Sequence, residues 1–438
     1  MPEVHEEIRA GIRQAVRRRM IADVPTGAFL SGGVDSAAVV AAMAENSSAP
    51  VKTFSIGFED ERYNELPLAK RTAQEFATEH HELIVRPDAI EILPKVVRHY
   101  GEPFADASAI PSFYLARFAR DHVTVALNGD GGDESFAGYQ RYTTNLALAE
   151  LDRLPLGPRR AVSAAARRAP LGHDRRSLRS RLGRFAVASG LDRERRYIAQ
   201  QSVFTATERN NLYTPDYSAL LGSSRTDAVL LDPWRSSTAT HLLDQLLDVD
   251  VNTYLPGDLL AKIDIATMAY SLEGRSPLLD HELMELAASL PPELKAGRGQ
   301  RKRILRSALR GWVPDEILDA PKRGFELPVA RWFRGELRDY TREVLLDTSA
   351  ISRGWCREAE VCRLLDEHAN GTRDHGRGIW RLLMLELWYQ GISAVPSQIS
   401  SPRAPQSLEG AHLAGQTMTG GGPQSPDRRG LVGARDRD

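Results

Sequence analysis

Two glycine-rich stretches of the sequence carry acidic side chains, and each follows a short apolar run. The first, LSGGVDS, covers residues 30–36 and leads into the helix-like run AAVVAAMAE. The second, NGDGGDESFAGY, covers residues 128–139. Glycine lets a backbone approach a ligand closely, and the amide groups at a helix start favour an anion. The first stretch therefore predicts a phosphate site in which Ser31, Gly32 and Gly33 offer N–H groups and a hydroxyl.

The Asp35 carboxylate and that phosphate are both negatively charged, so direct contact between them is unfavourable unless a cation lies between the two groups. A magnesium ion that bridges the carboxylate and a pyrophosphate group removes the conflict. If the strands that carry the two loops are neighbours in a parallel sheet, Asp35 and Asp133 can share this ion. The sequence contains no Walker-type GxxxxGK loop, and the second stretch lacks the spacing of a calcium loop. The alternative is an ordinary strand–helix turn with an aspartate near the helix start.

A third stretch, residues 255–291, has dense apolar positions and is predicted to be mostly buried helix. Lys262, Glu273 and Arg275 stand out in it, because charges among apolar residues need partners. Salt bridges alone are one explanation for the three charges. A lysine near a nucleotide could instead stabilise the charge that builds on a transferred phosphorus.

The elements that position these residues alternate between strands and helices. Apolar runs bounded by turn residues predict strands at TGAFL, VKTFSIGF, HHELIV and VTVALN, and helical patterns such as NELPLAKRTAQEFATEHH and SFYLARFARDH separate them. This order predicts a parallel sheet that helices cover on both faces.

Composition changes along the chain predict four regions. Residues 1–150 form a nucleotide-binding α/β core, and an Arg-rich helical region follows at 151–240. Residues 241–395 form the helical remainder that contains Lys262. The tail at 396–438 is rich in Gly, Pro, Ser and charge, so it is predicted to be disordered.

The overall composition limits the functional classes. The 438 residues have a net charge of −1, which gives no global attraction to nucleic acid or to an acidic membrane. No apolar run approaches the roughly 20 residues of a membrane helix. Cys356 and Cys362 fit neither a CxxC pair nor a zinc set and are expected in helices. These features predict a cytoplasmic protein with no nucleic-acid or membrane partner.

LSGGVDS resembles the pyrophosphate loop of the PP-loop ATP pyrophosphatases. Together with NGDGGDESFAGYQRY, LLAKIDIATMAYSLEGRSPLLD and PKRGFELPVARWF, it resembles the synthetase domain of class B, glutamine-dependent asparagine synthetases. The resemblance runs from about residue 5 to residue 395 and is weakest in the Arg-rich middle. It implies a five-stranded parallel α/β sheet of the adenine-nucleotide α-hydrolase type, with helical additions and with the two loop-bearing strands adjacent.

The resemblance also implies a reaction and its ligands. ATP activates the side-chain carboxylate of aspartate as β-aspartyl-AMP with release of pyrophosphate, and ammonia then displaces AMP. The implied pyrophosphate-binding residues are Ser31, Gly32, Gly33, Asp35 and Ser36, with Asp35 and Asp133 on magnesium. The implied adenine pocket consists of Leu30, Ile56, Asn128 and Gly129.

Four further residues receive roles from the resemblance. Lys262 would stabilise the charged phosphorus intermediate, and Glu134 and Tyr139 would face aspartate or its adenylate. Asp130 stands where many of these synthetases carry a glutamate that serves as the base for incoming ammonia. Because aspartate has a shorter reach, the acceptor is left open.

The start of the chain departs from the family pattern. Glutamine-dependent members begin with a glutaminase domain whose N-terminal cysteine is the nucleophile, whereas Met1 here is followed by Pro2. The expectation is therefore a truncated copy, or an enzyme that takes free ammonia or ammonia from a separate glutaminase subunit. A homodimer also remains open. A relative of β-lactam synthetases or lasso-peptide cyclases is a second interpretation, and an inactive fragment that serves as a binding module is a third.

Overall fold

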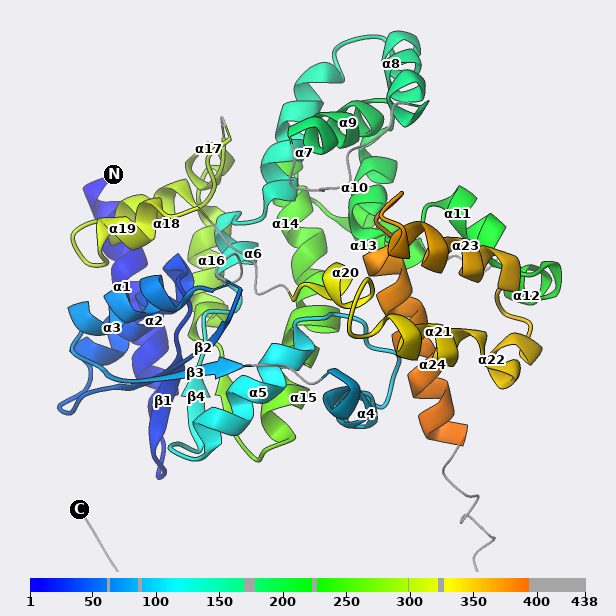
Figure 1. The fold of residues 1–438 in the computed structure, drawn as a ribbon. Coiled ribbons are helices and arrows are strands. Elements are labelled where there is room, and N and C mark those ends of the chain that lie inside the picture. The colour runs from blue at the N-terminus through cyan, green and yellow to red at the C-terminus, as the bar shows by residue number, and fades with distance from the viewer. Residues whose placement is uncertain are drawn as a thin grey trace, which may run out of the picture. The chain divides into compact units, whose positions relative to one another are not determined.

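A five-stranded parallel sheet forms the centre of the fold (Figure 1). The computed structural model describes residues 1–60, 64–85, 89–168, 178–222, 227–297, 299–321 and 327–393, so the predicted disordered tail lies outside the described residues. The strands are β1 (Thr26–Phe29), β2 (Lys52–Phe58), β3 (Glu79–Val85), β4 (Val125–Leu127) and β5 (Glu273–Arg275), in the order β3-β2-β1-β4-β5. The predicted fold class is confirmed.

The strand order reverses between β1 and β4, which are direct neighbours. Their parallel register pairs Ala28 of β1 with Leu127 of β4. The carboxyl ends of both strands therefore lie at one edge of the sheet, which is where ligands bind in open α/β sheets. The two acidic, glycine-rich loops both begin at this edge.

The fifth strand lies inside the stretch that the sequence predicted to be mostly helix. β5 pairs with β4, and its charged residues Glu273 and Arg275 bind each other, with Nε of Arg275 2.7 Å from Oε1 of Glu273. Arg275 also donates to the carbonyl oxygens of Arg19 and Ile21, both at 2.8 Å. A salt bridge and backbone contacts therefore account for these two charges.

Side chains of alternate strand residues enter two separate cores, because successive side chains of a strand point to opposite faces. Ala28 of β1 and Leu127 of β4 belong to one buried cluster, and Phe29 and Ala126 belong to the other. The first cluster includes residues of α1 (Pro2–Arg19), α2 (Val34–Glu45), α3 (Leu66–Glu75), α16 (His281–Ser289), α18 (Arg303–Leu309) and α19 (Asp315–Asp319). The second includes residues of α4 (Ala89–Tyr100), α5 (Ala109–Arg120), α15 (Ala261–Met268) and α24 (Gly376–Ser393). Helices thus cover both faces, as predicted.

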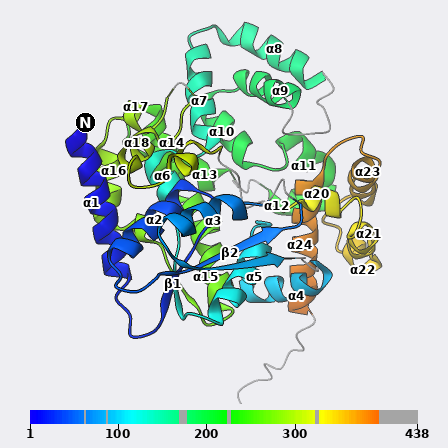
Figure 2. The ribbon, with the colours of Figure 1, turned by 60° about the vertical axis from the view of Figure 1, so that its left-hand side comes forward.

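A third buried cluster lies between helices and contains no strand residue. It includes residues of α7 (Gln140–Leu151), α10 (Arg193–Gln201), α13 (Ala228–Ser236) and α14 (Leu242–Asn252). Helices α8 (Leu156–Arg168) and α9 (Leu178–Ser189) pack against each other beside α7 and α10 in both views (Figures 1 and 2). These two helices correspond to the Arg-rich helical patterns of the sequence.

The remaining helices complete the surroundings of the site. They are α6 (Gly132–Phe136), α11 (Ala206–Leu212), α12 (Pro215–Leu221), the π-helical turn η2 (Leu255–Leu260), the 3₁₀ turn η3 (Pro277–Leu279), α17 (Pro292–Lys295), α20 (Val329–Trp332), α21 (Arg338–Leu346), α22 (Thr348–Ser352) and α23 (Glu358–Ala369). Cys362 lies in α23 as expected, but the expectation is wrong for Cys356, which forms an isolated antiparallel bridge with Tyr213. Within the described ranges, no helix has the length and apolar character needed to cross a membrane.

Candidate active site

A large cavity opens beside the carboxyl ends of β1 and β4. Its volume is about 2820 Å³, and every residue that the sequence assigned to the site lines it. These residues are Leu30, Ser31, Gly32, Gly33, Asp35, Ser36, Ile56, Asn128, Gly129, Asp130, Asp133, Glu134, Tyr139 and Lys262. The structure therefore brings together side chains that lie more than two hundred positions apart in the sequence.

The first loop is closed by its two serines. The hydroxyls of Ser31 and Ser36 lie 2.9 Å apart, and the Ser36 hydroxyl also donates to the carbonyl oxygens of Ser31 and Gly33, both at 3.2 Å. Helix α2 begins directly after Gly33. The loop therefore leads into the N-terminal end of a twelve-residue helix, where partial positive charge favours an anion.

The glycines of the second loop allow it to touch the first turn of α2. A Cβ atom on Gly132 would lie 2.4 Å from Oδ1 of Asp35, and one on Gly129 would lie 2.8 Å from the backbone nitrogen of Ser36. Both distances are too short for a side chain. The two loops can therefore meet only because these positions carry no Cβ.

Lys302 lies between the two carboxylates that the sequence assigned to a metal ion. Its ammonium group forms an ion pair with Asp35 and lies 2.6 Å from Oδ1 of Asp133. The Lys302 side chain is buried, and this burial lowers the pKa of its amine, although Asp35 and Glu134 oppose that effect. Asp35 and Asp133 therefore converge on one point, as expected. The ammonium group of Lys302 occupies that point.

Lys302 is a site residue that sequence reasoning missed. It is the residue before α18, in the stretch GQRKRILRSAL, where it cannot be distinguished by sequence from the neighbouring basic residues. Its backbone φ of +51° lies in the left-handed region, which is unfavourable for a residue with a side chain. This conformation is held in place while the lysine side chain reaches Asp35 and Asp133.

The two carboxylates suit a magnesium ion that also binds phosphate oxygens. Magnesium in nucleotide sites commonly takes one or two carboxylates together with substrate phosphates. Oδ1 of Asp35 is buried and accepts no hydrogen bond from a described residue. No cluster of three or more His, Cys, Asp or Glu side chains within the described ranges could hold a metal by itself. A metal at this point would thus depend on the nucleotide for its other ligands.

Glu134 and Tyr139 form a buried pair next to these carboxylates. The Tyr139 hydroxyl donates to Oε1 of Glu134 at 2.5 Å, and Glu134 is 1% exposed. Burial raises the pKa of Glu134, although the hydrogen bond from Tyr139 opposes the change. The Arg141 guanidinium lies 3.9 Å from the centre of the Tyr139 ring. A cation–π contact therefore supports the tyrosine from the side of α7.

Arg141 is held by a fully buried carboxylate on α14. Its Nε and Nη2 atoms donate to Oδ2 of Asp250 at 2.9 and 2.6 Å. The hydroxyls of Tyr142 and Tyr197 also donate to this carboxylate, which is 0% exposed. Asp250 and Arg141 were not predicted from the sequence, where each reads as one charged helix residue among many.

Lys262 lines the same cavity as Lys302 but pairs with a different carboxylate. Its Nζ atom lies 3.1 Å from Oδ2 of Asp106, whose carboxylate also accepts hydrogen bonds from the backbone and hydroxyl of Ser108 at 2.9 and 2.7 Å. Although burial opposes its charge, Asp106 and Asp130 hold the pKa of Lys262 above its usual value. Asp106 is a second residue that the sequence analysis missed, because it lies in a loop without a recognisable motif.

Two more carboxylates face the Lys262 ammonium. Burial raises the pKa of Asp130, although Lys262 opposes the change. Burial and the charge of Asp106 raise the pKa of Asp258 to about 6. Acidic groups thus surround this lysine, and the raised pKa of Asp258 brings that carboxyl group toward the pH range in which it could exchange a proton.

Of the predicted adenine-binding residues, Leu30 follows β1, Asn128 and Gly129 follow β4, and Ile56 lies within β2. Leu30 is 3% exposed and Ile56 is 5% exposed. The backbone of Leu30 is fixed by two contacts, because its N–H donates to Phe54 at 2.9 Å and its carbonyl accepts from the Ser55 hydroxyl at 2.5 Å. Oδ1 of Asn128 accepts from the backbone N–H of Asp130 at 3.0 Å. These contacts leave a preformed, largely apolar surface beside the loop.

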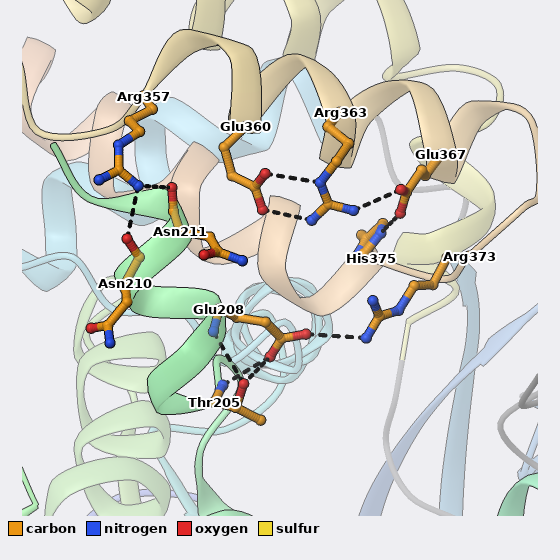
Figure 3. A network of polar contacts seen from close by, with 10 residues as sticks. All are labelled: Thr205, Glu208, Asn210, Asn211, Arg357, Glu360, Arg363, Glu367, Arg373 and His375. Atoms are coloured by element: carbon orange, nitrogen blue, oxygen red, sulfur yellow. Dashed lines mark hydrogen bonds and ion pairs between the residues drawn. The ribbon is translucent and has the colours of Figure 1, made fainter. Parts of the chain in front are cut away.

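Thr205, Glu208, Arg363 and Arg373 line another part of the cavity and belong to a network of polar contacts (Figure 3). Arg373 lies 3.2 Å from Oε1 of Glu208, whose other oxygen accepts from Thr205 in a capping box at the start of α11. Arg363 on α23 contacts Glu360 at 2.6 Å and Glu367 at 2.7 Å. The charges of Glu208, Arg363 and Arg373 are therefore paired within the chain.

Comparison with known proteins identifies relatives over most of the chain. The sequence pattern of the family described as "Asparagine synthase" matches residues 7–390. The chain is 33% identical over 388 residues to "Asparagine synthetase [glutamine-hydrolyzing] 1" of Bacillus subtilis (strain 168), covering 88% of this chain and 59% of that protein. It is 36% identical over 413 residues to a "Putative asparagine synthetase [glutamine-hydrolyzing]" of Mycobacterium tuberculosis (strain ATCC 25618 / H37Rv), covering 92% and 60%.

A more distant relative carries a different name. "Amidase chyE" of Penicillium rubens is 26% identical over 390 residues, covering 81% of this chain and 56% of that protein. In all three comparisons the chain spans less than two thirds of the relative's length.

Proposed function

The chain belongs to the asparagine synthase family, and from that premise we propose that it adenylates the side-chain carboxylate of aspartate and transfers the acyl group to ammonia. The first step joins a carboxylate oxygen to the α-phosphorus of ATP and breaks the bond to pyrophosphate. In the second step the ammonia nitrogen attacks the acyl carbon, and AMP leaves with the electron pair of the broken C–O bond.

The pyrophosphate side of the reaction is assigned to the first loop. Ser31, Gly32, Gly33 and Ser36 would bind the β- and γ-phosphates through hydroxyl and N–H groups at the start of α2. Leu30, Ile56, Asn128 and Gly129 would enclose the adenine. A magnesium ion held by Asp35 and Asp133 would supply positive charge to the pyrophosphate. Lys302, which already binds both carboxylates, supplies charge at the same point.

The acyl side of the reaction is assigned to the groups around Lys262. The ammonium of Lys262 would stabilise charge that develops on the α-phosphorus, because Asp106 and Asp130 keep it protonated. Glu134 and Tyr139 would contact aspartate and its adenylate. Asp130 would accept the proton that ammonia loses, and because burial raises its pKa, its carboxylate is a stronger base than an exposed aspartate.

One observation favours this proposal over the alternative functions. Two acidic, glycine-rich loops from adjacent parallel strands meet in a cavity that also holds Lys262 and its carboxylate partners. This combination supports an in-line displacement on a nucleotide phosphate with a carboxylate substrate nearby. An inactive binding module would have no need for the Lys262–Asp106 pair.

The products of the reaction test the proposal. The protein is incubated with ATP, magnesium, aspartate and ammonium chloride, and the nucleotide and amino-acid products are separated. We expect AMP, pyrophosphate and asparagine in equal amounts. ADP and phosphate would contradict adenylation, and no turnover of ATP would favour the binding module.

The size of the cavity supports a second candidate. Small-molecule pockets usually occupy about 300–1,000 Å³, whereas this cavity has about 2820 Å³. A carboxylate larger than aspartate would fit, as in β-lactam synthetases or lasso-peptide cyclases. AMP release that requires a different carboxylate, or that continues without ammonia, would support this candidate.

A further inference from the structure

A second cavity of about 510 Å³ shares part of its wall with the large one. The residues that line both cavities are Arg301, Arg306, Ala320 and Pro321. Arg301 directly precedes Lys302 and Arg306 follows it by four positions, so the shared wall lies at the pyrophosphate side of the site. The wall between the cavities is therefore cationic where it approaches the predicted phosphate loop.

The charges of these two arginines are poorly compensated. Among the described residues, Arg301 donates to the backbone carbonyl of Gly138 alone, at 3.4 Å, and Nη1 of Arg306 donates to the carbonyl of Leu318. Nε of Arg306 is buried and has no hydrogen-bond acceptor among the described residues. No carboxylate in the described part of the chain forms an ion pair with either guanidinium. Both arginine side chains are half-buried, and a guanidinium that is partly removed from water gains from a nearby negative charge, so an anion would stabilise this wall.

The electrostatic surroundings agree with this view. Burial lowers the pKa of Arg301, and burial together with the charge of Arg301 lowers the pKa of Arg306. The charges of Asp319 and Asp35 act on the pKa of Arg306 in the opposite direction, so this guanidinium lies within electrostatic reach of the aspartate in the first loop. Arg310, which also lines the second cavity, differs because Asp315 and Asp319 bind it at 2.7 and 2.6 Å.

We propose that Arg301 and Arg306 form a second anion site, which receives inorganic pyrophosphate after it leaves the loop at residues 31–36 and directs it toward the second cavity. Guanidinium groups suit this ligand because they bind phosphate oxygens through two parallel hydrogen bonds. The identity of the ligand rests on the proposed function, which makes pyrophosphate the leaving group. The same chemistry could serve the terminal phosphate of ATP, and the test must separate the two.

Isothermal titration of the full chain with magnesium pyrophosphate, without ATP or aspartate, measures the site directly. Each hydrogen bond to a charged group contributes about 1.5–3 kcal/mol, so Arg301→Gln and Arg306→Gln should each weaken pyrophosphate binding about tenfold or more. Arg342→Gln is the matched control, because this arginine pairs with Asp366 outside both cavities. Arg301→Gln guards against misfolding, since its one hydrogen bond is long, and thermal melting of each variant checks the fold.

Steady-state kinetics then separates product from substrate. In the variants, we expect the inhibition constant of pyrophosphate to rise about tenfold while the KM for ATP stays within about twofold. Equal weakening of ATP and pyrophosphate would overturn the second site and assign the arginines to the ATP terminal phosphate. Unchanged pyrophosphate binding would overturn it as well. If the proposed function fails, ATP–pyrophosphate exchange is absent, whereas the titration still reports the anion site.

Discussion

Lys302 changes the interpretation of the acidic pair at the phosphate loop. Asp35 and Asp133 were expected to share a cation, and the chain itself provides one in their midst. Two carboxylates this close together and partly removed from water repel each other, and the lysine offsets that repulsion. A nucleotide and metal bound as proposed would join this arrangement.

Asparagine substitution tests whether Asp35 and Asp133 act as one unit. Asp35→Asn and Asp133→Asn should each nearly abolish turnover, because the pyrophosphate charge is then poorly neutralised. The double variant should be little worse than either single variant. Turnover rates at saturating magnesium measure this, with Asp366→Asn on α23 as the control. Full activity in either single variant would refute the shared role.

Lys262 offers a test of transition-state stabilisation. Lys262→Ala should lower kcat about 10²-fold or more while the KM for ATP changes less, because its charge is needed where phosphorus charge develops. The variant leaves Asp106 buried without its partner, so Lys262→Ala combined with Asp106→Asn separates catalysis from folding. Lys95→Ala, which removes an exposed helix lysine, is the control. A normal kcat with a raised KM would indicate ATP binding alone.

Asp258 makes a prediction about stability and pH. Its folded-state pKa of about 6 lies above the ordinary value of 3.8, so the folded protein holds this proton more tightly than the unfolded chain. The stabilisation that this proton gives is complete below pH 3.8 and is lost as the pH rises through 6. The ionised group then costs at most about 3 kcal/mol, and less where water reaches it.

Asp258→Asn should therefore raise the free energy of unfolding by about 1–3 kcal/mol above pH 6. Below pH 4 the substitution should have little effect on stability. Urea unfolding of both proteins at pH 4, 5, 6 and 7 measures the difference, in which the other titrating groups largely cancel. A difference that stays constant with pH, or that shrinks as the pH rises, would contradict the assignment.

At the scale of elements, periodicity predicted the strands that are apolar and missed the one that is not. β1 to β4 coincide with apolar runs, whereas β5 consists of Glu273, Gly274 and Arg275. Its strand character arises from pairing with β4 and from the contacts of Arg275 with the end of α1. A three-residue charged strand has no local signal, so only the resemblance to a five-stranded family predicted it.

The residues of the candidate site also divide into those with a local sequence signal and those without one. Residues in motifs, such as Ser31 and Asp133, could be found from local sequence because their glycine neighbours mark a loop. Lys302 and Asp106 could not be found, since each carries out its role through a partner more than 150 positions away. Charge pairing over such distances depends on the folded arrangement and leaves no trace in spacing.

The buried carboxylate on α14 links the outer helices to the site. Asp250 fixes Arg141, and Arg141 in turn contacts the Tyr139 ring. Asp250→Asn should lower the free energy of unfolding by about 3–5 kcal/mol, because Arg141 is left without its counter-ion. Asp248→Asn, two positions earlier on the same helix, should change it by less than about 0.5 kcal/mol. Chemical unfolding measures both, and equal effects would contradict the role of Asp250.

At the scale of the molecule, the cavity joins elements from nearly the whole described chain. The phosphate loop lines one part of it, and Glu208, Arg363 and Arg373 line another (Figure 3). The sequence predicted the residues of the loop, because they lie in motifs. The pair of Glu208 and Arg373 was not predicted, because it joins α11 to the segment before α24.

Aspartate-dependent exchange of labelled pyrophosphate into ATP tests the central claim most directly. The assay reports reversible adenylation of a carboxylate and requires no nitrogen donor, so it isolates the chemistry assigned to the two loops and Lys262. Wild-type protein with ATP, magnesium and aspartate should incorporate label, and omission of aspartate or the Asp35→Asn substitution should abolish incorporation. Exchange that proceeds equally without any carboxylate, or its absence with aspartate and every other carboxylate tried, would contradict the account.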